Sequence, residues 1–246
     1  MNNLPPLADL QARYLELLQR LEANEREFRR LGRAVWRVQE DERRRLAREL
    51  HDGLGQNLTA LKHRLAQLAG ELGDDALRAR MEAAIALCAD ALEDTRHLSR
   101  LLRPPILDDL GLEPALRWLA RTVAEGGGPG VVVEIEPLPA LDGELQTLLF
   151  RIAQEALTNA SRHARAGSVL LRLVARGPQL QLQVIDDGEG FDPAATPRGS
   201  GLSGVRERLR LHGGRLELQS APGHGTRLRA SVPLADAPPQ PAPPAA

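Results

Sequence analysis

Residues 42–62 have the sequence ERRRLARELHDGLGQNLTALK, and two apolar patterns of the chain meet there. One pattern begins inside this stretch and continues past it. Its residues follow one another in steps of three and four: Leu54, Leu58, Leu61, Leu65, Leu68 and Leu72. After a turn at residues 70–75, a second stripe consists of Leu77, Met81, Ile85, Cys88, Leu92, Thr95 and Leu102. Such spacing places residues on one face of an α-helix. The two stripes predict a helical hairpin, with Asp74 or Asp75 as the N-cap of its second helix.

The residues before position 42 carry a separate heptad pattern. Its apolar positions are Leu7, Leu10, Tyr14, Leu17, Leu21, Phe28, Leu31, Val35 and Val38, and Asn24 is its one polar position. The pattern predicts a coiled coil between two chains, whose register a polar seam residue can fix. The alternative is a single amphipathic helix that packs on its own domain. Since a lone hairpin cannot bury both of its stripes, we expect two copies to form a four-helix bundle.

The composition changes after Pro104-Pro105, and the remainder predicts an α+β unit. Expected helices cover residues 112–124, 145–163 and 205–211, and expected strands cover 131–136, 168–175, 180–185, 215–220 and 226–233. A glycine-rich stretch runs from Gly188 to Gly204, and the Pro/Ala-rich residues 235–246 predict a disordered tail. We therefore expect helices on one face of a mostly antiparallel sheet.

Composition excludes several classes of protein. The formal net charge of −1 provides no field for nucleic acid or an anionic membrane, and 2% aromatic residues are too few for stacking on single strands. The single cysteine excludes a disulfide framework and a cysteine-based metal site. No apolar run approaches the ~18 residues of a membrane span, and the N-terminus does not resemble a signal peptide. We expect a cytoplasmic protein with no direct contact with nucleic acid.

The first hairpin helix carries a candidate site at His51, Asp52 and Gln56. If Leu50 and Leu54 share the buried face, His51 points roughly 100° away, toward solvent. Asp52 can hold the proton of one imidazole nitrogen, which makes the other nitrogen more nucleophilic. An ordinary surface histidine among charges is the alternative, and this motif alone does not decide between them.

A second candidate site lies on the expected helix at residues 145–163. Glu155 and Asn159 are four residues apart, and Arg162 continues their face. A carboxylate or amide oxygen suits Mg²⁺, which keeps several waters and borrows phosphate oxygens, and Arg162 could contact the phosphates. The alternative is an exposed polar helix face.

Glycines flank the last two candidates. Asp186 ends an expected strand just before Gly188 and Gly190, which places a carboxylate at the mouth of a pocket, although an ordinary Asp-Gly turn has the same sequence. Residues 199–204 match G-x-G-x-x-G, but they follow a loop instead of a strand, which excludes a dinucleotide fold. Glycines at a helix N-terminus still offer N–H groups to phosphates, and the alternative is a flexible loop.

Together these segments resemble, in order, the boxes of a two-component sensor histidine kinase of the subfamily related to nitrate/nitrite sensors. Residues 42–62 are similar to its phosphoacceptor box, and RLLRPPILDDLGLEPALRWL (100–119) is similar to its connection to the ATP-binding domain. RIAQEALTNASRHA (151–164) resembles the N box and VIDDGEGFD (184–192) the first glycine box. RGSGLSGVRERLRLHGGRLELQSAPGHGTRLRASVP (198–233) resembles the remaining glycine boxes, so the resemblance covers residues 38–234.

The resemblance implies a role for each matching residue. His51 is implied to be autophosphorylated, Asp52 to be the general base or orienting acid, and Gln56 to position water that dephosphorylates a partner. Asn159 corresponds to the Mg²⁺ ligand, with Glu155 one turn before it. The other residues implied to bind nucleotide are Asp186 at the adenine amino group, Thr226 beside the base, Arg162, His163, Gly188, Gly190, Gly199, Gly201 and Gly204.

Two positions depart from the family pattern. Arg162 stands where the family often has Lys. Asp187 stands where Asn is common, and its added negative charge is expected to weaken ATP binding slightly.

The resemblance also implies the architecture and the activity. We expect an α+β fold in which an N-terminal coiled coil and a helical-hairpin dimer, forming a four-helix bundle, precede an α/β sandwich ATP-binding domain of GHKL type. With ATP and Mg²⁺ as cofactors, the expected activity is autophosphorylation and phosphoryl transfer to an Asp of a response regulator. That regulator is expected to have a receiver domain and a helix-turn-helix output, and to be dephosphorylated by the same protein. The alternatives are a GHKL-type ATPase without phosphotransfer and a catalytically silent dimeric scaffold.

The expected domains are a coiled-coil signalling helix (1–37), the dimerisation and phosphotransfer hairpin (38–105), the ATP-binding domain (106–234) and the tail (235–246). The first segment is too short for a folded sensory domain. Either a separate sensor protein acts on the coiled coil, or the chain is the catalytic part of a longer sensor.

Overall fold

The computed structural model describes residues 7–193, 195 and 200–234, with the side chains of residues 7–12 and 200 excepted. The predicted tail at 235–246 and Gly199 lie outside the described residues. The chain divides into two compact units: residues 37–115 form one, and the residues before 37 together with those from 116 onward form the other. Within the described part of the chain, every helix is too short or too polar to span a membrane.

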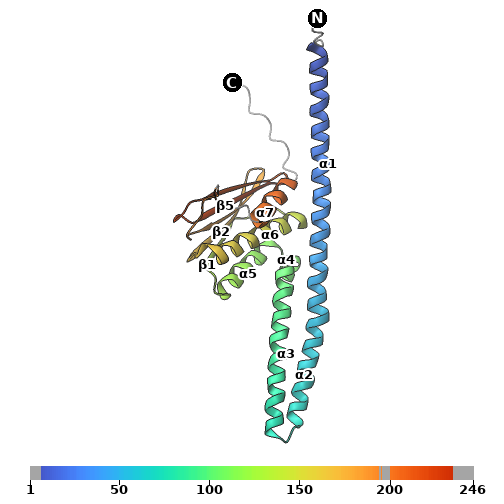
Figure 1. Ribbon diagram of the computed structural model, residues 1–246, viewed down its shortest axis with the longest axis vertical. Helices are drawn as coiled ribbons and strands as arrows, with labels where there is room; N and C mark the ends of the chain where they lie inside the picture. Colours follow the sequence, from blue (N-terminus) through green and yellow to red (C-terminus); the bar gives the residue numbers. More distant parts are fainter. Residues whose placement is uncertain (1–6, 194, 196–199, 235–246) are drawn as a thin grey trace. The chain divides into compact units, whose positions relative to one another are not determined.

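The N-terminal half of the chain is entirely helical. Its elements are α1 (Leu7–Arg48), the π-helical segment η1 (Glu49–Gly55), α2 (Gln56–Glu71), α3 (Asp75–Leu102) and the short helix α4 (Pro105–Asp109). Helices α2 and α3 run side by side and are joined by a tight turn (Figure 1). The predicted hairpin is therefore present.

Side chains define the ends of the hairpin and join its helices. Asp74 is the N-cap of α3, because its Oδ1 accepts hydrogen bonds from the backbone N–H groups of Ala76 (2.8 Å) and Leu77 (3.1 Å). Across the hairpin, the Cys88 thiol donates to the Leu58 carbonyl at 3.3 Å. Cys88 is buried, as expected for a small core residue.

The local structure around residue 51 differs from the predicted one. Leu50 and Leu54 were expected to share the buried face, yet Leu54 is half exposed in the single chain, and the buried residues are Ala47 and Gly55. The hydrogen bonds of the π-helical η1 span five residues instead of four, which shifts the face that points toward α3. Apolar periodicity alone does not reveal such a shift.

The heptad seam of α1 is exposed in the single chain. Its described apolar members are 56–68% exposed; they are Tyr14, Leu17, Leu21, Phe28, Leu31, Val35 and Val38. A different stripe of the same helix is partly covered: Trp36 is buried, and Glu25, Arg29 and Gly32 are half-buried. The coiled coil therefore stays a prediction, with an apolar seam available for it.

The C-terminal half is an α+β unit. Its elements are α5 (Leu112–Glu125), β1 (Gly130–Ile135), α6 (Gly143–Asn159), the π-helical segment η2 (Ala160–Ala164), β2 (Ser168–Arg176), β3 (Gln179–Asp186), α7 (Ser200–Leu211), β4 (Arg215–Ser220) and β5 (Thr226–Pro233). The strands form one sheet in the order β1-β2-β3-β5-β4. Only the β1–β2 pair is parallel, which confirms a mostly antiparallel sheet.

The core of this unit lies between the sheet and its helices (Figure 1). In β3, Gln179, Gln181 and Gln183 alternate with the buried Leu180, Leu182 and Val184, so one face of the strand is apolar and the other polar. Helices α6 and α7 contact each other and the sheet. The largest fully buried side chains of α6 are Leu148, Leu149, Phe150, Ile152 and Leu157.

Two helix boundaries differ from the predicted ones. The helix predicted at 145–163 begins at Gly143, because Asp142 caps it through the Leu145 N–H at 2.7 Å, and its last turn is the π-helical η2. The helix predicted to begin at residue 205 begins at Ser200, so Gly201 and Gly204 lie inside α7 and not in a loop before it. Glycine lowers helix propensity, which is why the sequence favoured the later start.

Candidate functional site

His51 lies in η1, is exposed, and lines a groove on the hairpin. The groove has a volume of about 350 Å³ and runs between η1–α2 and α3, with Gln56, Thr59, His63 and Arg96 among its walls. The Thr59 hydroxyl donates to the Gly55 carbonyl at 2.7 Å, which ties the end of η1 to α2. The structure thus brings His51 and Gln56, two of the three predicted residues of this site, to one accessible groove.

Asp52 faces a different hollow of the hairpin unit. That hollow is lined by Arg45, Arg48, Glu49, Asp52 and Gly53, and it does not include His51. Among the described residues, no hydrogen bond joins Asp52 to His51. The expected orienting contact between these two side chains is therefore not made in this conformation.

A cluster of charges precedes His51 on the same helix. Arg45 donates to Glu42 at 2.6 and 2.9 Å and to Glu49 at 2.7 Å. The hydrogen bond from Arg45 holds the pKa of Glu42 below its ordinary value, and Glu42 and Glu49 raise the pKa of Arg45 above its usual range. All three side chains are exposed, so the cluster contributes fixed charges at this position more than stability.

A second set of predicted residues meets where α6 and α7 touch. The Asn159 amide Nδ2 donates to Glu155 Oε1 at 3.3 Å, and both side chains are half-buried. A Cβ added at Gly201 would overlap the Glu155 carboxylate, so glycine allows the first turn of α7 to approach α6 this closely. Because Asn159 uses its amide nitrogen toward Glu155, its amide oxygen is available to a ligand.

A third set of predicted residues lies where the end of β3 pairs with the start of β5. Asp186 stands opposite Thr226 in the strand register, and Asp186 Oδ1 accepts from the backbone N–H of Thr226 and of Gly188, both at 3.1 Å. A Cβ at Gly188 would overlap the Ala164 carbonyl at the end of η2. Two backbone N–H groups, from the following turn and from β5, therefore hold the Asp186 carboxylate, and no hydrogen bond to its Oδ2 occurs within the part of the chain that the structure describes.

Ser220 organises the glycine turns next to Asp186 and was missed by the sequence analysis. Its hydroxyl donates to the Gly225 carbonyl at 2.9 Å, accepts from the Phe191 N–H at 2.9 Å and lies 3.1 Å from the Thr226 hydroxyl. Gly190 has φ +60°, and a Cβ there would overlap the Ala221 carbonyl. A serine at a strand end before a Pro-Gly turn was the one available indication.

Asp187, the residue after Asp186, lies against the start of β2. Its Oδ1 accepts from the backbone N–H groups of Gly167 (2.9 Å) and Ser168 (3.0 Å), which start β2. Its charge is therefore compensated by two backbone donors, and the side chain stabilises the start of a strand. The expected weakening of ATP binding by this charge stays a prediction.

The remaining predicted residues lie in η2 and in α7. Arg162 and His163 lie in η2 and are exposed. Gly204 lies in α7, where a Cβ would come within 2.9 Å of the tip of Arg208. Among the described residues, no group of three or more His, Cys, Asp and Glu side chains could hold a metal ion.

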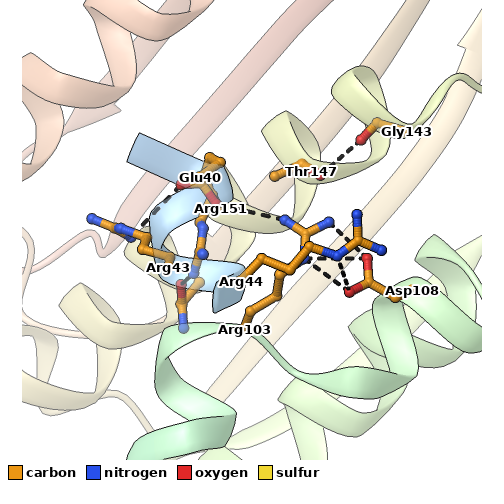
Figure 2. A network of polar contacts seen from close by, with 9 residues as sticks. Glu40, Arg43, Arg44, Arg103, Asp108, Gly143, Thr147 and Arg151 are labelled. Carbon is orange, nitrogen blue, oxygen red and sulfur yellow. Dashed lines mark hydrogen bonds and ion pairs between the residues drawn. The ribbon is translucent and has the colours of Figure 1, made fainter. Parts of the chain in front are cut away.

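An ion-pair network that the sequence analysis missed joins α1 to the segment after α3 (Figure 2). Arg103 donates to both oxygens of Asp108 at 2.8–3.2 Å, and Arg44 Nε lies 3.1 Å from the same carboxylate. Arg103 also lies 3.7 Å from Glu40, which is 3.8 Å from Arg43. The Arg103 and Glu40 side chains are only 10% and 8% exposed, so this network forms a buried polar link between the two ends of the hairpin unit.

Two family models match the chain. The model described as "Histidine kinase" matches residues 42–107, which include His51, and the model described as "Histidine kinase-, DNA gyrase B-, and HSP90-like ATPase" matches residues 144–236. The first range contains the groove of His51, and the second contains Glu155, Asn159, Asp186 and Thr226.

Curated proteins with similar sequences are sensor kinases. The sensor histidine kinase MctS of Rhizobium johnstonii is 36% identical over 213 residues, which cover 82% of this chain and 45% of that protein. The signal transduction histidine-protein kinase/phosphatase UhpB of Salmonella typhimurium is 34% identical over 227 residues, covering 90% of this chain and 44% of that protein. The chain thus spans less than half the length of these relatives.

Solved structures with a similar chain course include the histidine kinase domain of a blue-light activated kinase from Erythrobacter litoralis, with 22% identity and a TM-score of 0.45 over 73% of this chain and 95% of that one. Another is the Acinetobacter baumannii histidine kinase AdeS, with 13% identity and a TM-score of 0.43 over 74% of this chain and 97% of that one. The two family models, in this order along the chain, and the two sensor kinases show that the chain belongs to the two-component sensor histidine kinases.

Proposed function

We propose that this chain transfers the γ-phosphoryl group of ATP to His51 and then to an aspartate of a response regulator. The observation that carries the proposal is the exposed imidazole of His51 beside Gln56 in an open groove, in a chain that also has an ATPase-type domain. MctS and UhpB, which the chain resembles, are described as histidine kinases. The site and this similarity both support the proposal.

The nucleotide is proposed to bind between the Asp186 and Asn159 sets. Asp186 would accept a hydrogen bond from an adenine amino group at its Oδ2, since two backbone N–H groups already fix its Oδ1. Thr226 lies beside that carboxylate. Gly188, Gly190 and Gly201 (with Gly199) would allow backbone groups to approach the phosphates, and Gly201 offers a free N–H in the first turn of α7. Gly204, further along the helix, would leave room for the nucleotide because it has no side chain.

Mg²⁺ fits the residues at Asn159. The free amide oxygen of Asn159, oriented by the hydrogen bond to Glu155, is the kind of single protein ligand that Mg²⁺ uses when phosphates complete its coordination. When bound, the ion would neutralise charge on the transferring phosphoryl group. Arg162 and His163 are exposed close behind Asn159 in sequence and would contact phosphates from the side of η2.

In the first transfer, a His51 nitrogen forms a bond to the γ-phosphorus while the bond to the β–γ bridging oxygen breaks, which leaves ADP. Catalysis consists mainly of positioning and electrostatic stabilisation. Asp52 is retained as the proposed base or orienting acid, and its side chain would have to turn from its present hollow toward His51. In the second transfer, the phosphoryl group passes from nitrogen to a carboxylate of the receiver domain.

The groove of His51 is the proposed docking place of the receiver domain. It is open, its described walls come from both helices of the hairpin, and Gln56 lies in it with His51. There Gln56 would position the water that hydrolyses the regulator's phosphoaspartate. UhpB is described as a kinase/phosphatase, which supports both activities for this chain.

We propose that two chains pair through α1 and the hairpin. Beyond the exposed seam of α1, the hairpin exposes a second set of large apolar residues: Leu54, Leu61, Leu68, Leu77, Leu87, Leu98 and Leu101. Leu58, Leu65 and Leu72, in contrast, are only partly exposed because α3 lies against them. One hairpin therefore covers half of its leucine pattern, and a second copy would cover the rest, as in a four-helix bundle.

The proposed domain boundaries are those of the sequence pattern: residues 1–37, 38–105, 106–234 and 235–246. A partner or further domain that senses the stimulus would act through α1. A regulator with a helix-turn-helix output is the proposed partner, and the need for ATP places the reaction in the cytoplasm.

An ATPase without phosphotransfer is the second candidate. In that reaction Glu155 would activate water, but Glu155 Oε1 already accepts the Asn159 hydrogen bond and lies against Gly201. That candidate also assigns no role to the groove at His51.

Incubation of the purified chain with γ-labelled ATP tests the proposal. The wild-type chain should acquire acid-labile label, and His51→Ala should acquire none while still binding ATP. Gln56→Ala should be labelled but should dephosphorylate its regulator more slowly. Label that persists on His51→Ala would show that another residue accepts the phosphoryl group, and phosphate release without labelled protein would favour the ATPase.

A further inference from the structure

Three polar residues form a row across the end of the sheet. Asp186 ends β3, Thr226 begins β5 and Ser220 ends β4, and the strand register pairs Thr226 directly with both of the others. Side chains that are paired in this way lie on the same face of a sheet. Thr226 therefore has Asp186 on one side and Ser220 on the other.

This row continues the apolar face of the sheet. Every second residue of the three strands is apolar on that face: Leu180, Leu182 and Val184 in β3, Leu228, Ala230 and Val232 in β5, and Leu216 and Leu218 in β4. The last position of each series is a polar residue that is only partly buried. Because polar groups at the end of an apolar face need hydrogen-bond partners, the partners of this row decide what it can bind.

The hydrogen bonds of Ser220 fix the direction of its contact with Thr226. Ser220 has one hydroxyl hydrogen, and the Gly225 carbonyl at 2.9 Å can only accept it. The Phe191 N–H, also at 2.9 Å, can only donate to the Ser220 oxygen. In the remaining contact, at 3.1 Å, Thr226 is therefore the donor and Ser220 the acceptor.

The side chains of Thr226 and Asp186 consequently offer a ligand acceptors alone. The hydroxyl hydrogen of Thr226 is used toward Ser220, so its oxygen retains only lone pairs. The Thr226 N–H is used toward Asp186 Oδ1, which also accepts the Gly188 N–H. Two neighbouring oxygens, Thr226 Oγ1 and Asp186 Oδ2, are thus left to accept hydrogen bonds from a bound group.

We propose that Ser220 is a positioning residue that sets the base specificity of the nucleotide site, because it commits the Thr226 proton and leaves two adjacent acceptors. This inference rests on the proposed function, which brings adenine to Asp186. The 6-amino group of adenine has two N–H donors, one for each oxygen. A purine with a carbonyl at the same position brings a further lone pair toward both acceptors and is rejected.

The test compares the binding of ADP and inosine diphosphate, whose base has a 6-carbonyl and an N1 proton instead of the 6-amino group. Isothermal titration calorimetry with the full chain and Mg²⁺ measures both affinities without any need for phosphoryl transfer. The wild-type chain should bind ADP at least about tenfold more tightly than inosine diphosphate. In Ser220→Ala, the Thr226 hydroxyl hydrogen can turn toward a carbonyl, so the ratio of the two affinities should fall roughly three- to tenfold.

Matched variants separate this role from a structural one. Loss of the Phe191 and Gly225 contacts alone would weaken both nucleotides by the same factor and leave the ratio unchanged. Ser220→Thr retains a hydroxyl and should keep most of the ratio, whereas Ser220→Cys, whose thiol accepts hydrogen bonds weakly, should lower it. Gln219→Ala changes the exposed neighbour in β4 and should have no effect on the ratio.

A double variant tests whether Ser220 acts through Thr226. Thr226→Val removes the oxygen while keeping the shape of the side chain, and it should lower the ratio by itself. Adding Ser220→Ala should then cause no further change in the ratio. Thermal unfolding followed by circular dichroism shows which variants are folded, and Ser220→Cys serves in place of Ser220→Ala where the alanine chain does not fold.

The possible failures of the inference and of the proposed function are distinguishable. A wild-type chain that binds neither nucleotide, or an Asp186→Asn chain that binds ADP as tightly as the wild type, would overturn the nucleotide site and this inference with it. Normal ADP binding that depends on Asp186, together with an unchanged ratio in Ser220→Ala or Ser220→Cys, would overturn the inference alone. A further loss of the ratio in the double variant would likewise show that Ser220 does not act through Thr226.

Discussion

Replacing Gly201 by alanine should lower the autophosphorylation activity strongly while leaving the stability of the fold almost unchanged. A Cβ at this position would overlap Glu155 Oε1 and come within 2.8 Å of its Cδ, so the carboxylate must turn away. Turning breaks the 3.3 Å hydrogen bond between Asn159 Nδ2 and Glu155. The substitution thus acts on Asn159 without touching it.

The effect on stability should be close to zero. Alanine in a helix is more favourable than glycine by up to about 1 kcal/mol. The lost side-chain hydrogen bond contributes about 1 kcal/mol in the opposite direction. The displaced atoms are the flexible end of a side chain, so little backbone movement is needed. The thermal midpoint of unfolding should therefore stay within a few degrees of that of the wild-type chain.

The effect on phosphorylation should be large. Glu155 orients the amide whose oxygen is the proposed Mg²⁺ ligand, and removal of a group that orients a metal ligand typically lowers affinity or activity roughly 10–100-fold. We expect a loss of this size in kcat/KM for labelling from ATP at limiting Mg²⁺, with partial recovery as Mg²⁺ is raised. Gly204→Ala provides the same gain in helix propensity but displaces only the tip of Arg208, so its loss should be smaller.

A double variant tests whether Gly201→Ala lowers the activity through its effect on Glu155. In Glu155→Ala, the added methyl group at residue 201 has no carboxylate to displace, so Gly201→Ala should cause little further loss. Independent, multiplicative losses in the double variant would refute the reasoning, as would a Gly201→Ala chain with normal kcat/KM at low Mg²⁺.

Three further predictions concern the helical half of the chain. Arg103→Met should destabilise the hairpin unit by about 3 kcal/mol, because it leaves the buried Glu40 carboxylate with a weaker set of partners. Adding Glu40→Gln to the same chain should recover part of this loss. Hydrogen exchange of residues 37–48 and 99–110 measures both effects. Asp74→Ala should cost about 1 kcal/mol by removing the N-cap of α3, whereas Asp74→Asn should cost much less, as urea unfolding followed by circular dichroism would show. Val35→Asp should shift the chain toward monomer in light scattering, and an unchanged mass would contradict pairing through the seam.

The sequence predicted those features that side-chain periodicity encodes. Alternation of glutamine with apolar residues in β3 follows directly from which face of the sheet is buried, and the leucine steps of the hairpin follow from helix geometry. The predicted N-cap at Asp74 or Asp75 is realised at Asp74, because an N-cap depends only on residues close in sequence. The meeting of Asp186 with Thr226 was available only through the resemblance, because it joins two distant strands.

Other features depend on contacts that no local pattern encodes. The π-helix at His51 differs from an α-helix only in which backbone carbonyl each N–H bonds, and the same side chains fit either helix. The pairing of Arg103 with Glu40 and the turn-holding role of Ser220 arise only when distant segments meet. The hydrogen bonds from the Gly167 and Ser168 N–H groups to Asp187 also join segments about twenty residues apart, so no local pattern predicts them.

Hydrogen bonds from α3 flank the π-helical segment η1, which carries His51, on both sides. Before η1, the Ser99 hydroxyl of α3 donates to the Ala47 carbonyl at 2.8 Å, and after η1 the Cys88 thiol of α3 reaches the Leu58 carbonyl. Helix α3 thus clamps the π-helical segment at both ends. Since the Ser99 hydroxyl holds the Ala47 carbonyl one turn before His51, we expect Ser99→Ala to loosen the start of η1 and to let twisting of α1 reorient the imidazole more easily.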